Sequence, residues 1–206
     1  MKPGLHEVLE KYIPPEAVDT IAGWIISHGV RVRLAQGRSS KQGDYSPPGN
    51  GKGHRISVNS DLNKYAFLIT LVHEIAHLRI WQKHRGSKLP HGNEWKQEFK
   101  TLLYPFMDRF VFPEDVLSVL FSYLENPLAA SCSDTRLQRV LRKYNTEAVT
   151  CVDELPEGTV FRLPGGRIFR KIKKLRKRYR CIEVKTGIVF SVDPLAEAMP
   201  VPEGPA

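Results

Sequence analysis

Apolar residues recur at two different periods near the start of the chain. Within residues 15–28 they have helical spacing, and Gly29 follows as a stop signal. Residues 30–34 (VRVRL) and 54–59 (HRISVN) alternate between apolar and polar side chains, as half-buried strands do. Residues 35–53 between them are rich in Gly, Ser, Pro and Lys, which is typical of a loop or a long hairpin connection. The pattern predicts a helix followed by two strands.

Helical periodicity continues through the middle of the chain. The longest such segment, residues 62–83, has Ser60 or Asp61 as a candidate N-cap, and its central part is apolar on nearly all sides. This predicts a long, buried helix. Shorter segments with helical spacing follow it at residues 94–110, 113–124 and 133–144.

The pattern changes after Asn145. Across residues 158–192, β-branched and aromatic residues alternate with polar ones, and the sequences PGG and KTG fit turns. These features predict three or four antiparallel strands in a small sheet or barrel. Ile168, Ile172 and Cys181 are expected to face inward.

The predicted fold class is therefore α+β. With 206 residues, the chain is long enough for one good core or two small domains. We expect a helical domain with a small antiparallel sheet at residues 1–128, a connecting helix and linker at 129–150, a basic antiparallel β module at 151–200 and a disordered tail at 201–206.

Composition narrows the setting in which the protein works. No run of the sequence approaches the ~18 apolar residues that a membrane span needs, and the N-terminus has no apolar signal core. Cys132, Cys151 and Cys181 lie far apart, so neither a disulfide framework nor a cysteine metal cluster is expected. We therefore expect a cytoplasmic protein with no membrane partner.

The charge is high and unevenly distributed. A net charge of +9 favours polyanionic partners, although a generally basic, soluble surface is the simpler alternative. Residues 162–180 contain many Lys and Arg and no Asp or Glu, so they can contact several phosphates largely independently of sequence. The alternative is a solvated edge strand that its lysines protect from aggregation. The candidate nucleic-acid-binding residues are Arg170, Lys171, Lys173, Lys174, Arg176, Lys177, Arg178 and Arg180.

Two further features bear on nucleic-acid binding. Phe161, Phe169 and Tyr179 either stack on bases or belong to the core, and a core position is favoured for the two phenylalanines. Residues 38–55 have the composition of either a second basic surface or a mobile loop.

Residues 73–77 (HEIAH) carry the candidate chemistry. Positions i and i+4 of a helix lie about 40° apart, so His73 and His77 can direct two imidazoles at one cation. Glu74 can reach a water on that cation without binding the metal itself, and can act as a general base. Neutral imidazoles suit Zn²⁺, which in catalytic sites usually has three protein ligands and one open position. The alternative is a satisfied His–Glu pair in the core.

A third ligand must come from elsewhere in the chain. His91 opens the next predicted helix, and a chain reversal before it would bring it back to the metal. Glu98 and Glu94 are the competing ligands. His84 lies two turns beyond His77, about 10 Å along the axis, which is too far for direct ligation.

LVHEIAHLRIW at residues 71–81 and HGNEWK at residues 91–96 resemble the SprT-like (Spartan-related) zinc metalloprotease family, which pairs HExxH with a downstream HGxxWK. The strand at 30–34 and HRISVNSDL at 54–62 also agree, so the resemblance covers roughly residues 16–104. It implies a zincin-like arrangement and, for the best-known members, proteolysis of proteins trapped on DNA.

By this resemblance, one Zn²⁺ ion would be held by His73, His77 and His91, with Glu74 as the catalytic base. Trp95 would pack beside the third ligand. Many members of the family follow the protease domain with a cysteine zinc ribbon. This chain has no cysteine pairs, and the basic β module stands in that place.

Together these features predict a Zn²⁺-dependent endopeptidase of SprT-like type that acts on nucleic-acid-associated proteins, in the cytoplasm and in association with the nucleoid. One alternative is a nucleic-acid-binding protein with a structural, non-catalytic zinc site. Another is a metallohydrolase with a different substrate. The strand at residues 54–59 is expected to border the cleft and to pair with an extended substrate.

Overall fold

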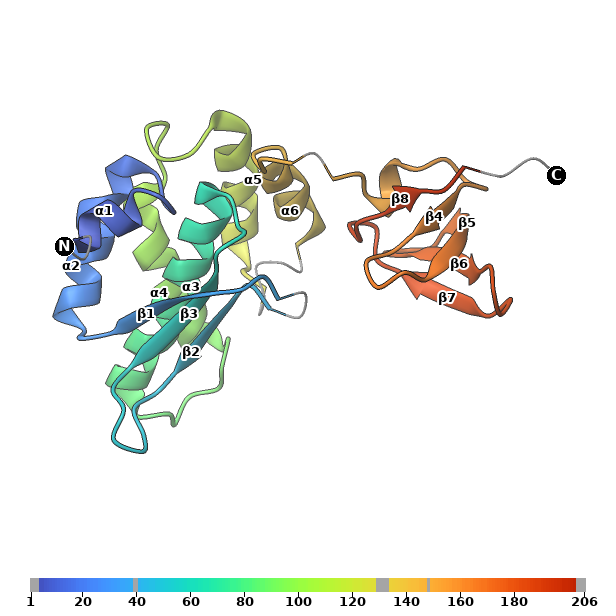
Figure 1. The fold of residues 1–206 in the computed structure, drawn as a ribbon. Coiled ribbons are helices and arrows are strands. Elements are labelled where there is room, and N and C mark those ends of the chain that lie inside the picture. The colour runs from blue at the N-terminus through green and yellow to red at the C-terminus, as the bar shows by residue number, and fades with distance from the viewer. Residues whose placement is uncertain (1–3, 39–40, 129–133, 148, 203–206) are drawn as a thin grey trace. The chain divides into compact units, whose positions relative to one another are not determined.

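The computed structural model describes residues 4–38, 41–128, 134–147 and 149–202. The chain forms two compact units, Met1–Thr146 and Glu147–Ala206, each with its own hydrophobic core (Figure 1). The fold is α+β, as predicted. No helix in the described ranges is both long enough and apolar enough to cross a membrane.

The N-terminal unit is mainly helical. Its helices are α1 (Leu5–Leu9), η1 (Pro15–Ala17), α2 (Val18–Ser27), α3 (Lys64–His84), α4 (Asn93–Leu103), η2 (Tyr104–Phe106), α5 (Glu114–Glu125) and α6 (Thr135–Arg142). The N-cap of α3 is Asn63, whose side chain accepts a hydrogen bond from the Ala66 N–H (3.0 Å). The helix therefore begins later than the Ser60 or Asp61 cap predicted from the sequence, because Asn63 satisfies a free N–H of its first turn.

The sheet of this unit is mixed, so the prediction of an antiparallel sheet is wrong. Its strands β1 (Arg31–Ala35), β2 (Gly43–Ser46) and β3 (Arg55–Asn59) lie in the order β1-β3-β2. β2 and β3 form an antiparallel hairpin, and β1 pairs in parallel with the other edge of β3. A parallel pair needs a long crossover connection. The connection between β1 and β3 falls almost entirely in the segment predicted as a loop or hairpin connection, residues 35–53, and it contains β2.

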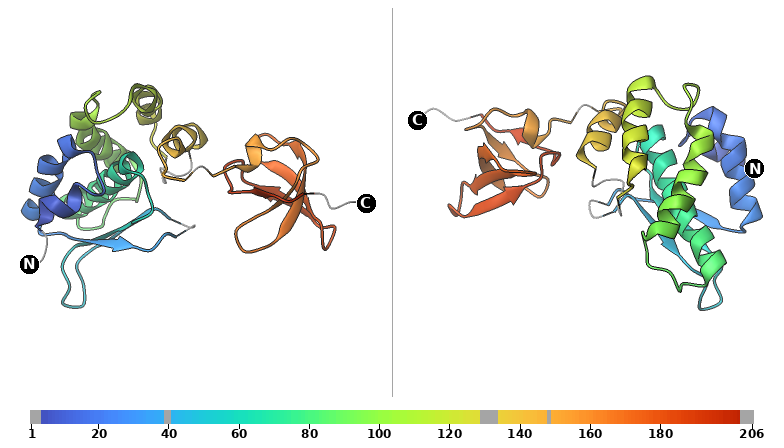
Figure 2. Two further views of the ribbon diagram at one scale, coloured as in Figure 1. Left: turned by 45° about the horizontal axis from the view of Figure 1, so that its top comes forward. Right: turned by 180° about the vertical axis from the view of Figure 1, so that it is seen from behind.

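The predicted buried helix is confirmed in α3. Every residue from Ala66 to Ala76 is buried, and Ile56 and Val58 of β3 belong to the same core. α3 and α4 lie behind the sheet in Figure 1 and in front of it in the reverse view of Figure 2. These two helices therefore cover one face of the sheet. Ile56 and Val58 point towards them, so the residues that alternate with these along β3 point to the opposite face.

α6 belongs to the N-terminal unit. Leu137 and Leu141 are buried in its core, and the Tyr144 hydroxyl just after the helix donates to Asp115 of α5 (2.6 Å). The helix expected within a connector at residues 129–150 is thus a packed part of the first unit, since its apolar face needs burial. Residues 129–133 of that connector lie outside the described ranges.

The C-terminal unit is an antiparallel sheet in the order β7-β6-β5-β4-β8. Its elements are η4 (Val152–Glu154), β4 (Val160–Arg162), β5 (Ile168–Lys174), β6 (Tyr179–Glu183), β7 (Val189–Val192) and β8 (Met199–Pro200). The Val201 N–H donates to the Val160 carbonyl (2.9 Å), so the expected disorder of residues 201–206 does not reach Val201. Residues 203–206 lie outside the described ranges.

The inward face of β5 differs from the predicted one. Phe169 and Lys171 are buried, whereas Ile168 and Ile172 are only half-buried. A strand turns alternate residues to opposite faces, so these two pairs cannot share a face. The large aromatic ring of Phe169 sets the register, and an irregularity follows between Lys171 and Lys173. Cys181, also predicted to face inward, is fully buried.

Candidate metal centre

Three imidazoles converge at one point in the N-terminal unit. His73 and His77 lie one turn apart on α3, and His91 comes from the turn that precedes α4. The Nε2 atoms of His73 and His77 are 3.3 Å apart, those of His91 and His73 are 3.3 Å apart, and those of His77 and His91 are 2.9 Å apart. Ligands held tetrahedrally at about 2.0–2.1 Å from Zn²⁺ are separated by roughly 3.3 Å. The three nitrogens therefore fit one metal ion.

A strained turn places His91 in this group. Its backbone has a φ of +62°, in the left-handed region that residues other than glycine rarely adopt. Gly92 then serves as the N-cap residue of α4. Such conformations persist where the surrounding structure requires them. Here the turn directs the imidazole back towards α3, the chain reversal predicted from the sequence.

The Trp95 ring packs against all three histidines. It is buried, and its ring centroid lies 4.5 Å from that of His73, 4.8 Å from that of His91 and 5.2 Å from that of His77. Phe99 stacks on Trp95 at 5.2 Å between centroids. Trp95 thus packs beside the third histidine, the position that the family resemblance implies. Aromatic packing of this kind restricts the orientation of the imidazoles.

The histidines are neutral at ordinary pH. Burial lowers the pKa of His73 to about 2 and that of His77 to about 3, and in both cases neighbouring histidines add to the effect. Burial also lowers the pKa of His91. Neutral imidazole is the form that binds a metal, so no proton on these rings competes with an ion at neutral pH.

Glu74 is enclosed between α3 and β2. Burial is the main cause that raises its pKa to about 8, and the negative charge of Asp44 adds to it. Lys41, a hydrogen bond from the Tyr45 backbone, and Arg38 act in the opposite direction. In the absence of a metal, Glu74 therefore holds a proton at neutral pH. A cation bound beside it would favour the carboxylate instead.

Gly43 lets β2 approach this carboxylate. A Cβ atom at this position would lie 2.6 Å from Glu74 Oε1 and 2.7 Å from Thr70 Cγ2, which is closer than atoms can pack. Neither Gly43 nor β2 was predicted from the sequence. The sequence feature that could have revealed the hairpin is PPGNGKG, a turn-rich stretch between two short segments, which is typical of a β-hairpin.

The structure decides between the candidate third ligands. Glu98 lies in an ion-pair cluster with Lys83 and with Arg79, whose Nε is 2.9 Å from the Glu98 carboxylate. Glu94 pairs with Lys88 (2.5 Å). Within the described ranges, the group of side chains able to hold a metal consists of His73, His77 and His91. His91 is therefore the third member.

β3 cannot accept a substrate strand, so that expectation is wrong. It lies between β1 and β2, and both of its edges are occupied by strand pairing. The sequence pattern predicts strands but does not fix their order in the sheet. β2 is an edge strand of this sheet, and it borders Glu74.

Most of the predicted nucleic-acid-binding residues are exposed, but Lys171 is not. Lys171 is only 2% exposed, and its ammonium donates to the carbonyls of Val152 (2.7 Å) and Leu155. It also lies 3.9 Å from the centre of the Tyr179 ring. A buried ammonium needs such partners, so Lys171 holds the module together instead of facing a ligand. The exposed candidates are Arg170, Lys173, Lys174, Arg176, Lys177, Arg178 and Arg180.

The aromatic residues of the module are core residues. Phe161 and Phe169 are buried, as favoured from the sequence, and Tyr179 is buried as well. None of these rings is available for stacking on bases. The basic surface of the module therefore offers charge without these aromatic platforms.

Three neutral imidazoles presented by an HExxH helix and the following turn, with a buried carboxylate beside them, define a candidate single-metal centre of the HExxH class. Residues 17–108, which contain all of these groups, match the model of the SprT-like family. The family resemblance is thus confirmed for this segment: the N-terminal unit contains an SprT-like domain.

Proteins named Protein SprT are similar to this chain. That of Shigella sonnei is 34% identical over 95 residues, covering 38% of this chain and 57% of the relative. That of Escherichia coli O157:H7 is 33% identical over 99 residues, covering 46% and 56%. That of Salmonella arizonae is 50% identical over 56 residues, covering 25% and 33%. The matches thus span from a third to 57% of the relatives' length. No solved structure matches the chain significantly.

Proposed function

We propose that the N-terminal unit is a Zn²⁺-dependent endopeptidase of SprT-like type with a zincin-like arrangement. The observation that carries this proposal is the convergence of three Nε2 atoms at 2.9–3.3 Å from one another beside a buried glutamate. Structural zinc sites usually have four protein ligands, whereas catalytic sites have three and one open position. In the described ranges this group has three, which favours catalysis over a purely structural ion.

In this mechanism His73, His77 and His91 would hold the ion, and Trp95 restricts their orientation. Zn²⁺, when bound, would supply Lewis-acid chemistry that activates a water molecule for attack on a peptide carbonyl. Glu74 would take a proton from the water as its oxygen bonds to the peptide carbonyl carbon, and would pass that proton to the amine nitrogen as the C–N bond breaks. Burial favours the protonated form of Glu74 and a bound cation would favour the carboxylate, so these opposing effects suit a group that takes up a proton and then releases it.

The edge of β2 is the proposed binding site for the substrate chain. An edge strand offers unpaired N–H and C=O groups that an extended peptide can join. Because Gly43 touches Glu74, a peptide paired along β2 would pass beside the catalytic carboxylate. This arrangement suits an endopeptidase, since it recognises backbone and not a chain end.

We also propose that the substrates are proteins associated with nucleic acid, in the cytoplasm or on the nucleoid. The exposed Lys and Arg side chains of the C-terminal unit support recruitment to phosphates, in a salt-dependent manner.

Glu74→Gln tests the enzymatic proposal directly. The variant should bind one equivalent of zinc and lose cleavage of a DNA-bound protein by about 10²–10⁴-fold, the usual contribution of a general base. His91→Ala should lose zinc as well as activity, as measured by metal analysis. If the wild-type protein binds zinc but cleaves no protein, with or without DNA, the site is structural and the alternative of a non-catalytic nucleic-acid-binding protein stands.

A further inference from the structure

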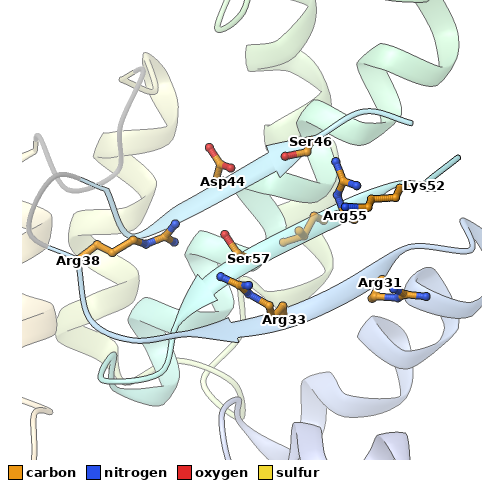
Figure 3. Close-up of a pocket in the computed structure, with 9 residues that line it drawn as sticks. Arg31, Arg33, Arg38, Asp44, Ser46, Lys52, Arg55 and Ser57 are labelled. Carbon is orange, nitrogen blue, oxygen red and sulfur yellow. The ribbon is translucent and has the colours of Figure 1, made fainter. Parts of the chain in front are cut away.

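The face of the N-terminal sheet that points away from the helices carries a basic pocket (Figure 3). Its volume is about 390 Å³. It lies on the face of the strands opposite to the metal centre. Three of its five cations, Arg38, Lys52 and Arg55, belong to residues 38–55, for which the sequence left open either a second basic surface or a mobile loop, whereas Arg31 and Arg33 were not predicted as site residues. The lining residues are Arg31, Arg33, Arg38, Asp44, Ser46, Lys52, Arg55, Ile56 and Ser57.

Strand register builds this pocket. Arg31 of β1 lies opposite Arg55 of β3, which in turn lies opposite Ser46 of β2. In the next row on the same face, Ser57 of β3 lies between Arg33 and Asp44. Neighbouring strands are about 4.7–4.9 Å apart, so each row brings its side chains within reach of one ligand.

The positive charges in this pocket are poorly compensated within the protein. In the described part of the chain, no carboxylate lies within ion-pair distance of Arg31, Arg33, Lys52 or Arg55, as the ion pairs formed there involve other residues. The carboxylate that lines the pocket, Asp44, is paired with Lys41 (2.6 Å). Like charges placed opposite one another in a sheet are destabilising. An external anion would relieve this repulsion.

Arg38 adds an independent sign of a missing partner. Its Nε donates to the Asn59 side chain (2.8 Å), but its Nη2 atom is buried and has no hydrogen-bond partner. Buried polar groups are usually satisfied. A guanidinium donor without a partner at the edge of this pocket is consistent with a missing acceptor there.

We propose that this pocket binds the phosphate backbone of nucleic acid. Four of its five cations are arginines, whose planar guanidinium groups match phosphate oxygens in a bidentate manner. Ser46 and Ser57 add hydroxyl donors between them. Among the described residues that line the pocket none is aromatic, so recognition involves the backbone and not the bases. The ligand is therefore bound independently of sequence.

The position of the pocket gives this binding a consequence. β2 contributes Asp44 and Ser46 to the pocket on one face, and Gly43 contacts Glu74 from the other. Nucleic acid bound here would be held by the SprT-like domain itself, on the strands that border the catalytic glutamate. Because binding requires no cleavage, it can be measured on the Glu74→Gln protein and does not depend on the proposed peptidase activity.

The test compares two triple variants of the full-length Glu74→Gln protein. The first, Arg31→Gln with Arg33→Gln and Arg55→Gln, removes three charges from the pocket. The matched control removes three exposed charges elsewhere in the same unit: Lys11→Gln, Lys64→Gln and Arg109→Gln. Binding of a labelled single-stranded and a duplex oligonucleotide is followed by fluorescence anisotropy between 50 and 200 mM salt. Circular dichroism and zinc content report the fold.

The pocket variant should bind at least one of the two oligonucleotides more weakly, and its salt slope on that oligonucleotide should fall by about 2–3, roughly 0.7–0.9 for each phosphate that is no longer neutralised. The control should keep the slope of the parent. Ser57→Glu, which places one negative charge in the middle of the pocket, should also weaken binding. Comparison of the two oligonucleotides identifies which form of the backbone is bound.

Equal slopes for the pocket variant and its parent would overturn the proposal, as would equally weakened binding in the pocket variant and the control. Polyglutamate provides the remaining comparison. One outcome is that polyglutamate binds the parent protein as tightly as the oligonucleotides do and fails to bind the pocket triple variant. The pocket then recognises acidic polymers in general, and the assignment to nucleic acid fails. If the pocket triple variant does not fold, Ser57→Glu alone decides.

Discussion

Glu74 has an environment opposite to that of a surface carboxylate. It follows His73 on α3 and is buried against β2, with its pKa raised to about 8. In the metal-free protein this is a source of instability, because the unfolded chain releases the proton that the folded protein retains. The positive charge of a bound cation would stabilise the carboxylate form of Glu74 and so lower its pKa. At the residue scale, metal binding and protein stability are therefore coupled through one proton.

This coupling predicts a pH-dependent difference between metal-free wild type and metal-free Glu74→Gln. The folded pKa is raised, so the stability that protonated Glu74 contributes is fully present below about pH 4.5 and lost as the pH rises through about 8. Glu74→Gln should show no such loss. Chemical denaturation of EDTA-treated proteins at pH 5, 7 and 9 measures the difference.

The histidines provide the internal control for this measurement. The pKa values of His73 and His77 are lowered to about 2 and about 3. The stability that these neutral histidines contribute is therefore present above about pH 6.5 and is lost as the pH falls through these values. Both proteins share this contribution, and it cancels in the difference. Parallel stability curves for the two proteins would contradict the raised pKa of Glu74.

At the element scale, β2 joins the two surfaces of the N-terminal unit. One face touches Glu74 and Thr70 through Gly43, and the other lines the basic pocket through Asp44 and Ser46. β2 is only four residues long, at the edge of its sheet. Its position therefore depends on the β3 pairing and on its close approach to α3.

Gly43→Ala should reduce peptide cleavage by about 10- to 100-fold with zinc still bound, since displacement of a catalytic group by roughly 1 Å has effects of this size. The added methyl group would lie 2.6 Å from Glu74 Oε1, so either the strand or the carboxylate must move. Gly53→Ala is the matched control, because it lies on the same hairpin with nothing within 4 Å of the added methyl group. Steady-state kinetics and metal analysis check both variants. Full activity in Gly43→Ala would show that the site tolerates a shifted β2.

β5 shows that basic residues of one strand can have opposite roles. Lys171→Ala should destabilise the C-terminal unit by about 2–4 kcal/mol, because the buried carbonyls of Val152 and Leu155 lose their donor. Lys173→Ala should leave stability within about 0.5 kcal/mol, as is usual for an exposed position, and weaken oligonucleotide binding instead. Thermal unfolding and anisotropy separate the two effects. The interpretation of Lys171 fails if its variant unfolds like the wild type.

The elements also show what sequence pattern can and cannot predict. α3, its HExxH face and the return of His91 were predicted, because helical spacing and motif spacing are local and strong. β2 was missed, because a short polar edge strand with half-buried side chains has no apolar alternation to detect. The role of Lys171 was missed for a different reason: lysines are seldom fully buried, and only the folded module shows which carbonyls lie around its ammonium.

At the scale of the whole molecule, each unit has its own core and its own cationic surface. The first core includes α6, and the second is built around Phe161, Phe169 and Cys181. The metal centre and the basic pocket both lie within the first unit. Metal binding should therefore not require the second unit, whereas nucleic-acid affinity should draw on both.

Separating the chain after Thr146 tests this division. Residues 1–146 should fold and bind one equivalent of zinc, because the three histidines, Trp95 and the packed helix α6 are all retained. Their affinity for oligonucleotides should fall but not vanish, since Arg31, Arg33 and Arg55 remain while the cations of β5 are removed.

A cut after residue 128 is the matched control. It should yield a less stable protein, because it removes the buried leucines of α6 and the hydrogen bond between Tyr144 and Asp115. Zinc content, thermal unfolding and anisotropy measure these outcomes. Loss of zinc binding in residues 1–146 would show that the metal centre needs the C-terminal unit, and complete loss of oligonucleotide binding would place all affinity in the β module.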